Sequence, residues 1–533
     1  MQLNFFGADR AVTGSCHGLT VGGYRLLIDC GLQQGRDEID NRLFPFAANQ
    51  IDDVIITHAH IDHTGRIPLL VKQGFRGRIF ATEMTCRLMR IMLLDSGHIQ
   101  EAEAEYENRK RARSGKNPFE PLYTIADVEE SLKLLVPVDY DTPFKINENV
   151  TFQFTDAGHL LGSAYVQLWV TEGSETRKLV FSGDIGNVDQ PVIKDPAPVS
   201  GADYVIMEST YGDRNHEQPD DYCTVLTDIL RRTFSRGGTV LIPSFAVGRT
   251  QELLYFFREI KQRNLLPEFP DFPIVVDSPL SVEATQIYSS DLSGYLDDEA
   301  AALIRSGSQL FSVSNTRLVV TSDESKALNA DRTPKVIIAA SGMCDAGRIR
   351  HHLKHNLWRP ECAVVFVGFQ AYGTLGRALQ EGKKTVKLFG EEVQVRASIE
   401  TFQGLSSHAD HDHLIAWAEQ FAKHAPKQVF VVHGDAPVAE QFSEELCNRG
   451  LPAHAPLYRE CFDLISDRIT FEGEKPAKKR AAIAGSPEYR ALEEAGKQLE
   501  DVIRENKGLC NRELRKFTAQ LQNLIQAWRR KNN

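Results

Sequence analysis

The 533-residue sequence lacks any apolar run long enough to cross a membrane. Its apolar stretches, such as residues 54–56 and 335–340, fall far short of the roughly 18–20 residues that a membrane-spanning helix needs. The first residues also lack the basic and apolar regions of a secretory signal peptide. We therefore expect a cytoplasmic protein that makes no contact with membranes.

Paired cysteine spacings are also missing. The nine cysteines are scattered, their number is odd, and no Cys-x-x-Cys pair occurs. This pattern argues against a disulfide framework and against a structural zinc site built from cysteines. We expect reduced thiols, with Cys16 and Cys30 among small or apolar neighbours.

Positive charge is scarce over most of the chain, which has a formal net charge of −11. Residues 474–533 hold 14 Lys and Arg against 8 Asp and Glu, so this tail carries +6 and the remainder −17. A cationic metal site also requires local acidity, so the overall charge does not exclude a nucleic-acid partner.

The pattern of apolar residues divides the chain into four regions. Residues 1–208 alternate short apolar strands with turns, and residues 209–390 repeat strand, small-residue loop and helix, which favours a parallel sheet flanked by helices. Residues 391–470 return to strands with one helix. The tail, residues 471–533, begins with a basic linker at 475–484 and continues with apolar residues at helical spacing.

The clearest chemical motif is His58-Ala-His60-Ile-Asp62-His63, directly after the apolar residues 54–57. Imidazoles and a carboxylate are suitable zinc ligands. Strand alternation places His58 and His60 on one side, whereas Asp62 and His63 point differently. Two metal ions about 3.5–4 Å apart would use all four donors. The motif therefore predicts a bimetallic hydrolytic site.

Further donors follow other apolar strands of the chain. The residues concerned stand just past the carboxyl ends of these strands: His159, Asp184, Glu208 and His433. Each alone is a weak indication, but open α/β sheets place their sites along this edge. We expect these side chains to complete the metal site.

Together these residues resemble the metallo-β-lactamase fold in its β-CASP branch, a family of nucleic-acid hydrolases. The matching motifs extend from residue 1 to about 470, and only the tail lies outside. Glu208 lies in Glu-Ser-Thr-Tyr-Gly, His408 in Ser-Ser-His-Ala-Asp, and His433 matches a third motif. The opening residues 7–17 are similar to relatives of the endonuclease subunit of the eukaryotic mRNA 3′-end cleavage complex.

The resemblance implies an α/β fold, a metallo-β-lactamase αββα sandwich with an inserted β-CASP α/β domain and a helical C-terminal tail. It implies that residues 1–208 and 391–470 are two parts of one domain. It also implies two Zn²⁺ ions per chain: one held by His58, His60 and His159, the other by Asp62, His63 and His433. Asp184 would bridge both ions.

The expected catalytic residues are Asp62, Glu208 and His408. Zinc supplies hydroxide near neutral pH, and His408 would protonate the leaving ribose oxygen while Glu208 orients its imidazole. Phosphate contacts are expected from Ser244, Arg249 and Ser341, in loops that open helices. Ser406, beside His408, is a further expected phosphate contact.

We therefore predict a zinc-dependent ribonuclease that acts on single-stranded RNA in RNA processing or decay. In the family, a histidine at the third motif is typical of RNA-processing members, so His433 favours RNA. A DNA-processing β-CASP nuclease and a non-catalytic RNA-binding subunit remain as alternatives. Endonucleolytic or 5′-exonucleolytic cleavage, and a homodimer formed through the tail, both remain open.

Overall fold

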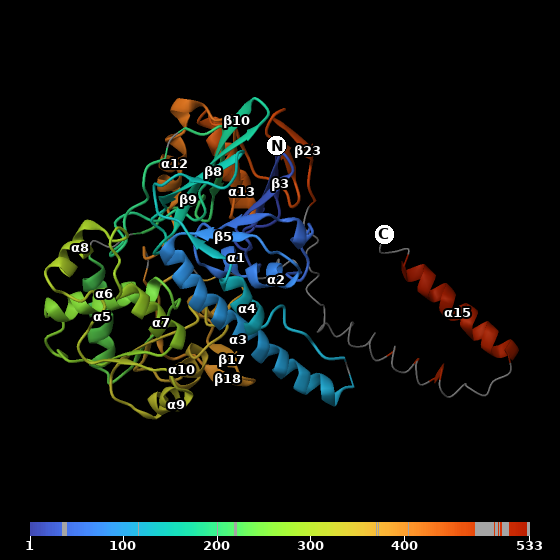
Figure 1. The fold of residues 1–533 in the computed structure, drawn as a ribbon. Coiled ribbons are helices and arrows are strands. Elements are labelled where there is room, and N and C mark those ends of the chain that lie inside the picture. The colour runs from blue at the N-terminus through green and yellow to red at the C-terminus, as the bar shows by residue number, and fades with distance from the viewer. Residues whose placement is uncertain are drawn as a thin grey trace. The chain divides into compact units, whose positions relative to one another are not determined.

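The computed structural model describes residues 1–34, 40–115, 117–199, 201–217, 221–368, 370, 373–402, 404–474, 495, 499, 502–503 and 511–529. The chain divides into two units, Met1–Pro476 and Ala477–Asn533. In the first unit, the blue N-terminal segments and the orange segments from beyond residue 400 share one lobe, and the green and yellow segments between them form another (Figure 1).

The first sheet has eight strands in the order β23-β22-β1-β2-β3-β4-β5-β6, of which β3 to β6 are parallel. Its strands are β1 (Gln2–Phe5), β2 (His17–Val21), β3 (Tyr24–Ile28), β4 (Asp53–Ile55), β5 (Arg78–Ala81), β6 (Leu135–Pro137), β22 (Cys461–Asp463) and β23 (Arg468–Phe471). The sheet thus joins the beginning of the chain to residues beyond 460.

The second sheet has seven strands in the order β21-β20-β11-β10-β9-β8-β7. Its strands are β7 (Phe144–Lys145), β8 (Val150–Asp156), β9 (Ala164–Glu172), β10 (Glu175–Phe181), β11 (Tyr204–Glu208), β20 (Gln428–Val432) and β21 (Ala453–His454). β11 and β20 pair in parallel, with Glu208 opposite Val432. This register brings residue 433 beside residue 209, although more than 200 residues separate them in the sequence.

The two sheets pack face to face, because alternate residues of their strands are apolar and point inward. The core between them includes Phe5, Ile28, Phe80, Phe154, Phe181 and Phe430. Helices α2 (Ile67–Lys72), α3 (Glu83–Arg113) and α4 (Ile125–Leu132) cover the outer face of the first sheet, and α12 (His411–Glu419) and α13 (Ala436–Asn448) cover that of the second. The predicted αββα sandwich is confirmed.

The third sheet has six parallel strands in the order β14-β13-β15-β12-β16-β19. They are β12 (Val240–Pro243), β13 (Ile274–Val276), β14 (Thr316–Leu318), β15 (Val336–Ala339), β16 (Ala363–Phe366) and β19 (Ser398–Thr401). The central strands are continuous apolar runs that are buried throughout, as expected for a parallel sheet with both faces covered.

Helices and one hairpin accompany this sheet. They are α5 (Tyr222–Phe234), α6 (Arg249–Gln262), α7 (Pro279–Tyr288), α8 (Asp298–Arg305), α9 (Ser322–Ala330), α10 (Ile349–Asn356), α11 (Leu375–Gln380) and the hairpin of β17 (Thr385–Leu388) and β18 (Glu391–Gln394). Apolar clusters lie on both faces of the sheet. The predicted inserted α/β domain is therefore present.

The expected limits of the insertion, residues 209 and 390, remain predictions. β11 ends at Glu208, and the next strand, β12, belongs to the six-stranded sheet. β19 also pairs with β16 in that sheet, although the sequence pattern assigned residues 391–470 to the first domain. The strand pairing favours an end of the insertion near residue 401, where β19 ends. The sequence pattern did not indicate this strand, because an edge strand of four residues gives only a short apolar signal.

The second unit contains helix α15 (Asn511–Arg529), in agreement with the helical spacing of the tail. The expected basic linker, residues 475–484, lies outside the described residues. The shorter elements of the first unit are η1 (Ala48–Gln50), α1 (Ile61–Thr64) and η2 (Ala422–His424). No helix among the described parts of the chain is both long and apolar enough to span a membrane.

Candidate metal centre

The donors predicted from the sequence lie together at one edge of the sandwich. His58 follows β4, and His60 caps the short helix α1, which carries Asp62 and His63. The other donors come just after strands of the second sheet: His159 after β8, Asp184 after β10 and His433 after β20. A Cβ at Gly31 would lie 1.5 Å from the Asp62 carbonyl oxygen, so this glycine lets the chain after β3 approach α1.

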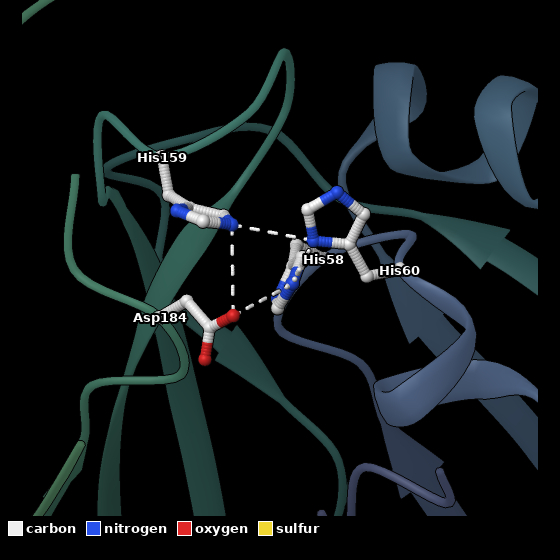
Figure 2. A group of neighbouring side chains, drawn as sticks. All are labelled: His58, His60, His159 and Asp184. Atoms are coloured by element: carbon white, nitrogen blue, oxygen red, sulfur yellow. Dashed lines mark hydrogen bonds and ion pairs between the residues drawn. The ribbon is translucent and has the colours of Figure 1, made fainter. Parts of the chain in front are cut away.

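The first group of donors contains His58, His60, His159 and Asp184 (Figure 2), with ligand atoms within 4.8 Å of one another. His60 Nδ1 lies 3.0 Å from His58 Nε2 and 3.2 Å from His159 Nε2. Asp184 Oδ2 lies 3.4 Å from His58 Nε2 and 3.5 Å from His159 Nε2. Three nitrogens and one oxygen thus converge on one point.

The second group contains Asp62, His63 and His433. His433 Nε2 lies 3.3 Å from His63 Nε2 and 3.5 Å from Asp62 Oδ2. The other carboxylate oxygen of Asp184, Oδ1, lies 3.3 Å from His63 Nε2 and 3.6 Å from His433 Nδ1. Asp184 therefore directs one oxygen toward each group.

The protonation states of the side chains in the first group suit a cation. Burial lowers the pKa of His60 to about 3, and burial also lowers the pKa of His58 and His159, so that these imidazoles are neutral. Burial alone would raise the pKa of Asp184, but the neighbouring histidines hold it well below its ordinary value. Neutral imidazoles and ionised carboxylates are the forms that bind zinc.

One oxygen of Asp184 provides a further test of fit. Oδ1 is buried and accepts no hydrogen bond among the described residues. A buried carboxylate oxygen that accepts no hydrogen bond is costly unless a cation lies beside it. The donor set and this oxygen both fit a metal site, with zinc as the ion that suits its imidazole and carboxylate ligands.

Hydrogen bonds from surrounding residues hold the imidazoles of His63 and His159 in place. Asp29 is the main residue that makes them. Asp29 Oδ2 lies 2.7 Å from His63 Nδ1 and accepts a hydrogen bond from the Thr57 hydroxyl. Ser407 supplies a carbonyl oxygen 3.1 Å from His159 Nδ1. The sequence interpretation missed Asp29, although it directly follows β3 at the same sheet edge as His58.

We expect Asp29→Asn to weaken zinc binding about 10–100-fold, because carboxylates that hold metal-ligating histidines act on this scale. The measurement is zinc retained per chain during titration with a chelator. Asp323→Asn, at a carboxylate that is 93% exposed, is the matched control. Equal zinc retention by the two variants would show that Asp29 does not support the site.

Glu208 and His408 form a third group together with Asp184. His408 Nδ1 lies 3.2 Å from both carboxylate oxygens of Glu208 and 4.0 Å from Asp184 Oδ2. Burial would lower the pKa of His408, but the charges of Glu208 and Asp184 exceed this effect and raise it to about 9. The expected pair of catalytic side chains is therefore adjacent to the two donor groups.

The residues expected to bind phosphate lie in different environments. Ser406 is beside His408 and accepts a hydrogen bond from its backbone N–H at 3.3 Å. Ser244 is buried and contacts the Thr250 hydroxyl, and the buried Arg249 is paired with Glu252. Ser341 contacts the backbone of residue 346. Their contacts with phosphate stay predictions, and the inward pairing of Arg249 argues against a direct one.

Known families and proteins match this chain over most of its length. Three family descriptions fit successive segments: a Beta-lactamase superfamily domain at residues 24–233, a Beta-Casp domain at 250–379, and a Zn-dependent metallo-hydrolase RNA specificity domain at 392–456. The first segment contains most strands of the sandwich, and the second lies within the domain of the six-stranded sheet. The third leads back to β20 and β21 of the sandwich.

The similar proteins include a ribonuclease, a transcription termination factor and an RNase J-like protein. Ribonuclease TTHA0252 from Thermus thermophilus is 39% identical over 451 residues, covering 84% of this chain and 97% of that protein. Transcription termination factor FttA from Methanosarcina mazei is 33% identical over 82% of this chain and 67% of its own length. An RNase J-like protein from Methanocaldococcus jannaschii is 29% identical over 81% and 92%. The chain belongs to the β-CASP family of ribonucleases with the metallo-β-lactamase fold.

Proposed function

We propose that this protein is a two-zinc ribonuclease that hydrolyses phosphodiester bonds of single-stranded RNA in RNA processing or decay. The observation that carries the proposal is the position of Asp184, whose two oxygens face two separate groups of donors. A carboxylate shared in this way is typical of two-metal hydrolytic sites. The ribonuclease name of a relative covered over 97% of its length supports RNA as the substrate.

In this proposal His58, His60 and His159 hold one zinc ion and Asp62, His63 and His433 hold the other, with Asp184 shared. Bound zinc would lower the pKa of water to about 7 and offset charge on the phosphoryl oxygens. Asp29 and Ser407 keep His63 and His159 in the orientation needed for binding, because each accepts a hydrogen bond from the nitrogen opposite the ligating one.

His408 is the proposed donor of a proton to the leaving ribose oxygen. Its Nδ1 faces Glu208, and its Nε2 has no hydrogen-bond partner in the described part of the chain. The side chain is 20% exposed, so substrate can reach it. Glu208 is held in turn by the backbone N–H groups of Ile185 and Thr210. Glu208 would thus fix both the orientation and the charge of the imidazole.

We expect Glu208→Gln to shift the alkaline limb of the pH–rate profile to lower pH. A general acid acts only while protonated, so its contribution is present at low pH and lost as pH rises through its pKa. Burial lowers the pKa of His408 and Glu208 is the first group that raises it, so removing this charge must lower it. The kcat profiles of the two proteins give the shift, and coinciding alkaline limbs would contradict the role of Glu208.

A DNA-processing nuclease and a non-catalytic RNA-binding subunit are the alternatives. Every donor of the two groups is present, which argues against a non-catalytic subunit. The decisive substrates are an RNA and a DNA single strand of the same sequence, together with a circular RNA. Cleavage of RNA in preference to DNA supports the proposal, and preference for DNA overturns it. Cleavage of the circle would assign endonuclease action, since a circle offers no end.

A further inference from the structure

A polar pocket of about 360 Å³ lies in the inserted domain, outside the metal centre. Its lining includes Arg350 from α10, Thr374 beside α11, and Lys383, Thr385 and Lys387 from the turn and strand that follow. The volume is within the range of pockets that hold small ligands or parts of larger ones. We call this the cationic pocket.

The charges around the cationic pocket do not cancel. Among the described residues, neither Lys383 nor Lys387 makes an ion pair, even though Glu392 lies opposite Lys387 in the β17–β18 ladder. Nearby acids have other partners: Glu391 pairs with Lys354, and Glu381 pairs with Arg377. The pocket therefore retains positive charge in a chain whose net charge is −11.

Arg350 contributes a buried donor. Its Nε is buried and has no hydrogen-bond partner among the described residues, while Nη1 donates to the Asp345 carbonyl oxygen at 3.1 Å. The guanidinium also lies 4.9 Å from the ring centroid of Phe389. Asp345 is the only acid among the described residues that line the pocket, and its carboxylate already accepts a hydrogen bond from the Leu375 N–H. One carboxylate against three cations leaves an anion as the matching ligand.

The pocket and the metal centre are linked by loops at one edge of the six-stranded sheet. β12 and β15 are parallel, so the loops that follow them, residues 244–248 and 340–348, lie at the same edge. Gly248 of the first loop lies against Leu160, the neighbour of the ligand His159. The ring of Phe245 lies against Gly342 of the second loop, which continues into the pocket residue Asp345.

We propose that the cationic pocket binds phosphate groups of the RNA strand away from the bond that is cleaved. This inference rests on the proposed function and adds an anchoring site to it. A single strand bound through its backbone requires cations and hydroxyls rather than groups that read base edges, and the pocket offers Arg350, Lys383, Lys387 and the Thr385 hydroxyl. RNA too short to reach the pocket would bind only at the metal centre.

The test compares Lys383→Ala/Lys387→Ala with the control Lys384→Ala/Lys423→Ala in the full chain. Both control lysines are exposed, lie outside the pocket and make no ion pair in the described part of the chain. Binding of RNAs of about 6 and about 30 nucleotides with a backbone that resists hydrolysis is measured by fluorescence anisotropy on the metal-loaded protein, over a range of salt concentrations. Cleavage is measured with unmodified RNAs of the same lengths. A mononucleotide is added as a competitor to separate RNA from small phosphate ligands.

The pocket variant should bind the long RNA about tenfold more weakly, with a salt-dependence slope smaller by about 1.4, or about 0.7 for each lost phosphate contact. Its binding and cleavage of the short RNA should match those of the control. Equal slopes in the two variants, or competition by the mononucleotide at micromolar concentration, would overturn the pocket assignment alone. Failure of the unaltered protein to bind or cleave either RNA would overturn the proposed function as well.

Discussion

Asp184→Asn should reduce RNA cleavage by about 10³-fold or more and lower the zinc content of the chain at the same time. The substitution keeps the shape of the side chain but removes the negative charge that both donor groups share. Loss of one preorganised charge-stabilising group already costs about 10²–10³ in rate, and here the same change also weakens metal binding. Activity and zinc per chain are measured on the same preparation.

The control for this variant is Asp298→Asn, at an exposed carboxylate in the first turn of α8. Both proteins should unfold at similar temperatures in the metal-free state, because a single side chain contributes little to stability compared with the packing of the two sheets. Asp62→Asn provides a second variant that affects only one donor group. Full activity and two zinc ions in Asp184→Asn would show that the carboxylate is not shared between metals.

His408→Ala should lower RNA cleavage by about 10²–10⁴-fold while both zinc ions are retained, because proton transfer by a positioned side chain contributes on this scale. His408 belongs to neither of the two groups assigned to zinc. A phosphodiester with a p-nitrophenolate leaving group should be cleaved almost normally, since this group departs without a proton. A purely structural role would reduce both reactions together.

His411→Ala is the matched control for this prediction. His411 lies three residues away at the start of α12 and pairs with Glu445 and Asp412 rather than with the metal centre. It should cleave RNA at nearly the normal rate. If His408→Ala retained normal RNA cleavage, or lost activity equally on both substrates, the leaving group would have to receive its proton from another residue.

Much of the site could be predicted because each donor follows an apolar strand. His58, His159, Asp184 and Glu208 stand at such positions, and strands that lie side by side must bring their ends together. The proximity of His433 depends on the parallel pairing of β11 with β20, which no local pattern reveals. Its position just past an apolar strand made it a candidate donor, and the family resemblance assigned it to the second metal ion.

Other features could not be predicted from local patterns. Asp29 also follows an apolar strand, as the proposed metal ligands do. From the sequence, a carboxylate at such a position could bind the metal or hold a ligand by a hydrogen bond, and the structure shows that Asp29 contacts His63. Arg249 stands at the start of a helix, as phosphate-binding residues do, yet its pairing with Glu252 depends on side-chain packing. The cationic pocket also required the structure, because its residues come from three separate elements.

The two-zinc ribonuclease is tested by the zinc content of the purified full chain, measured together with its cleavage of RNA before chelation, after chelation and after zinc is restored. We expect about two zinc ions per chain, loss of cleavage on chelation, and recovery that follows the return of zinc. Undiminished cleavage by the metal-free chain, or a chain that neither binds zinc nor cleaves RNA, would contradict this expectation.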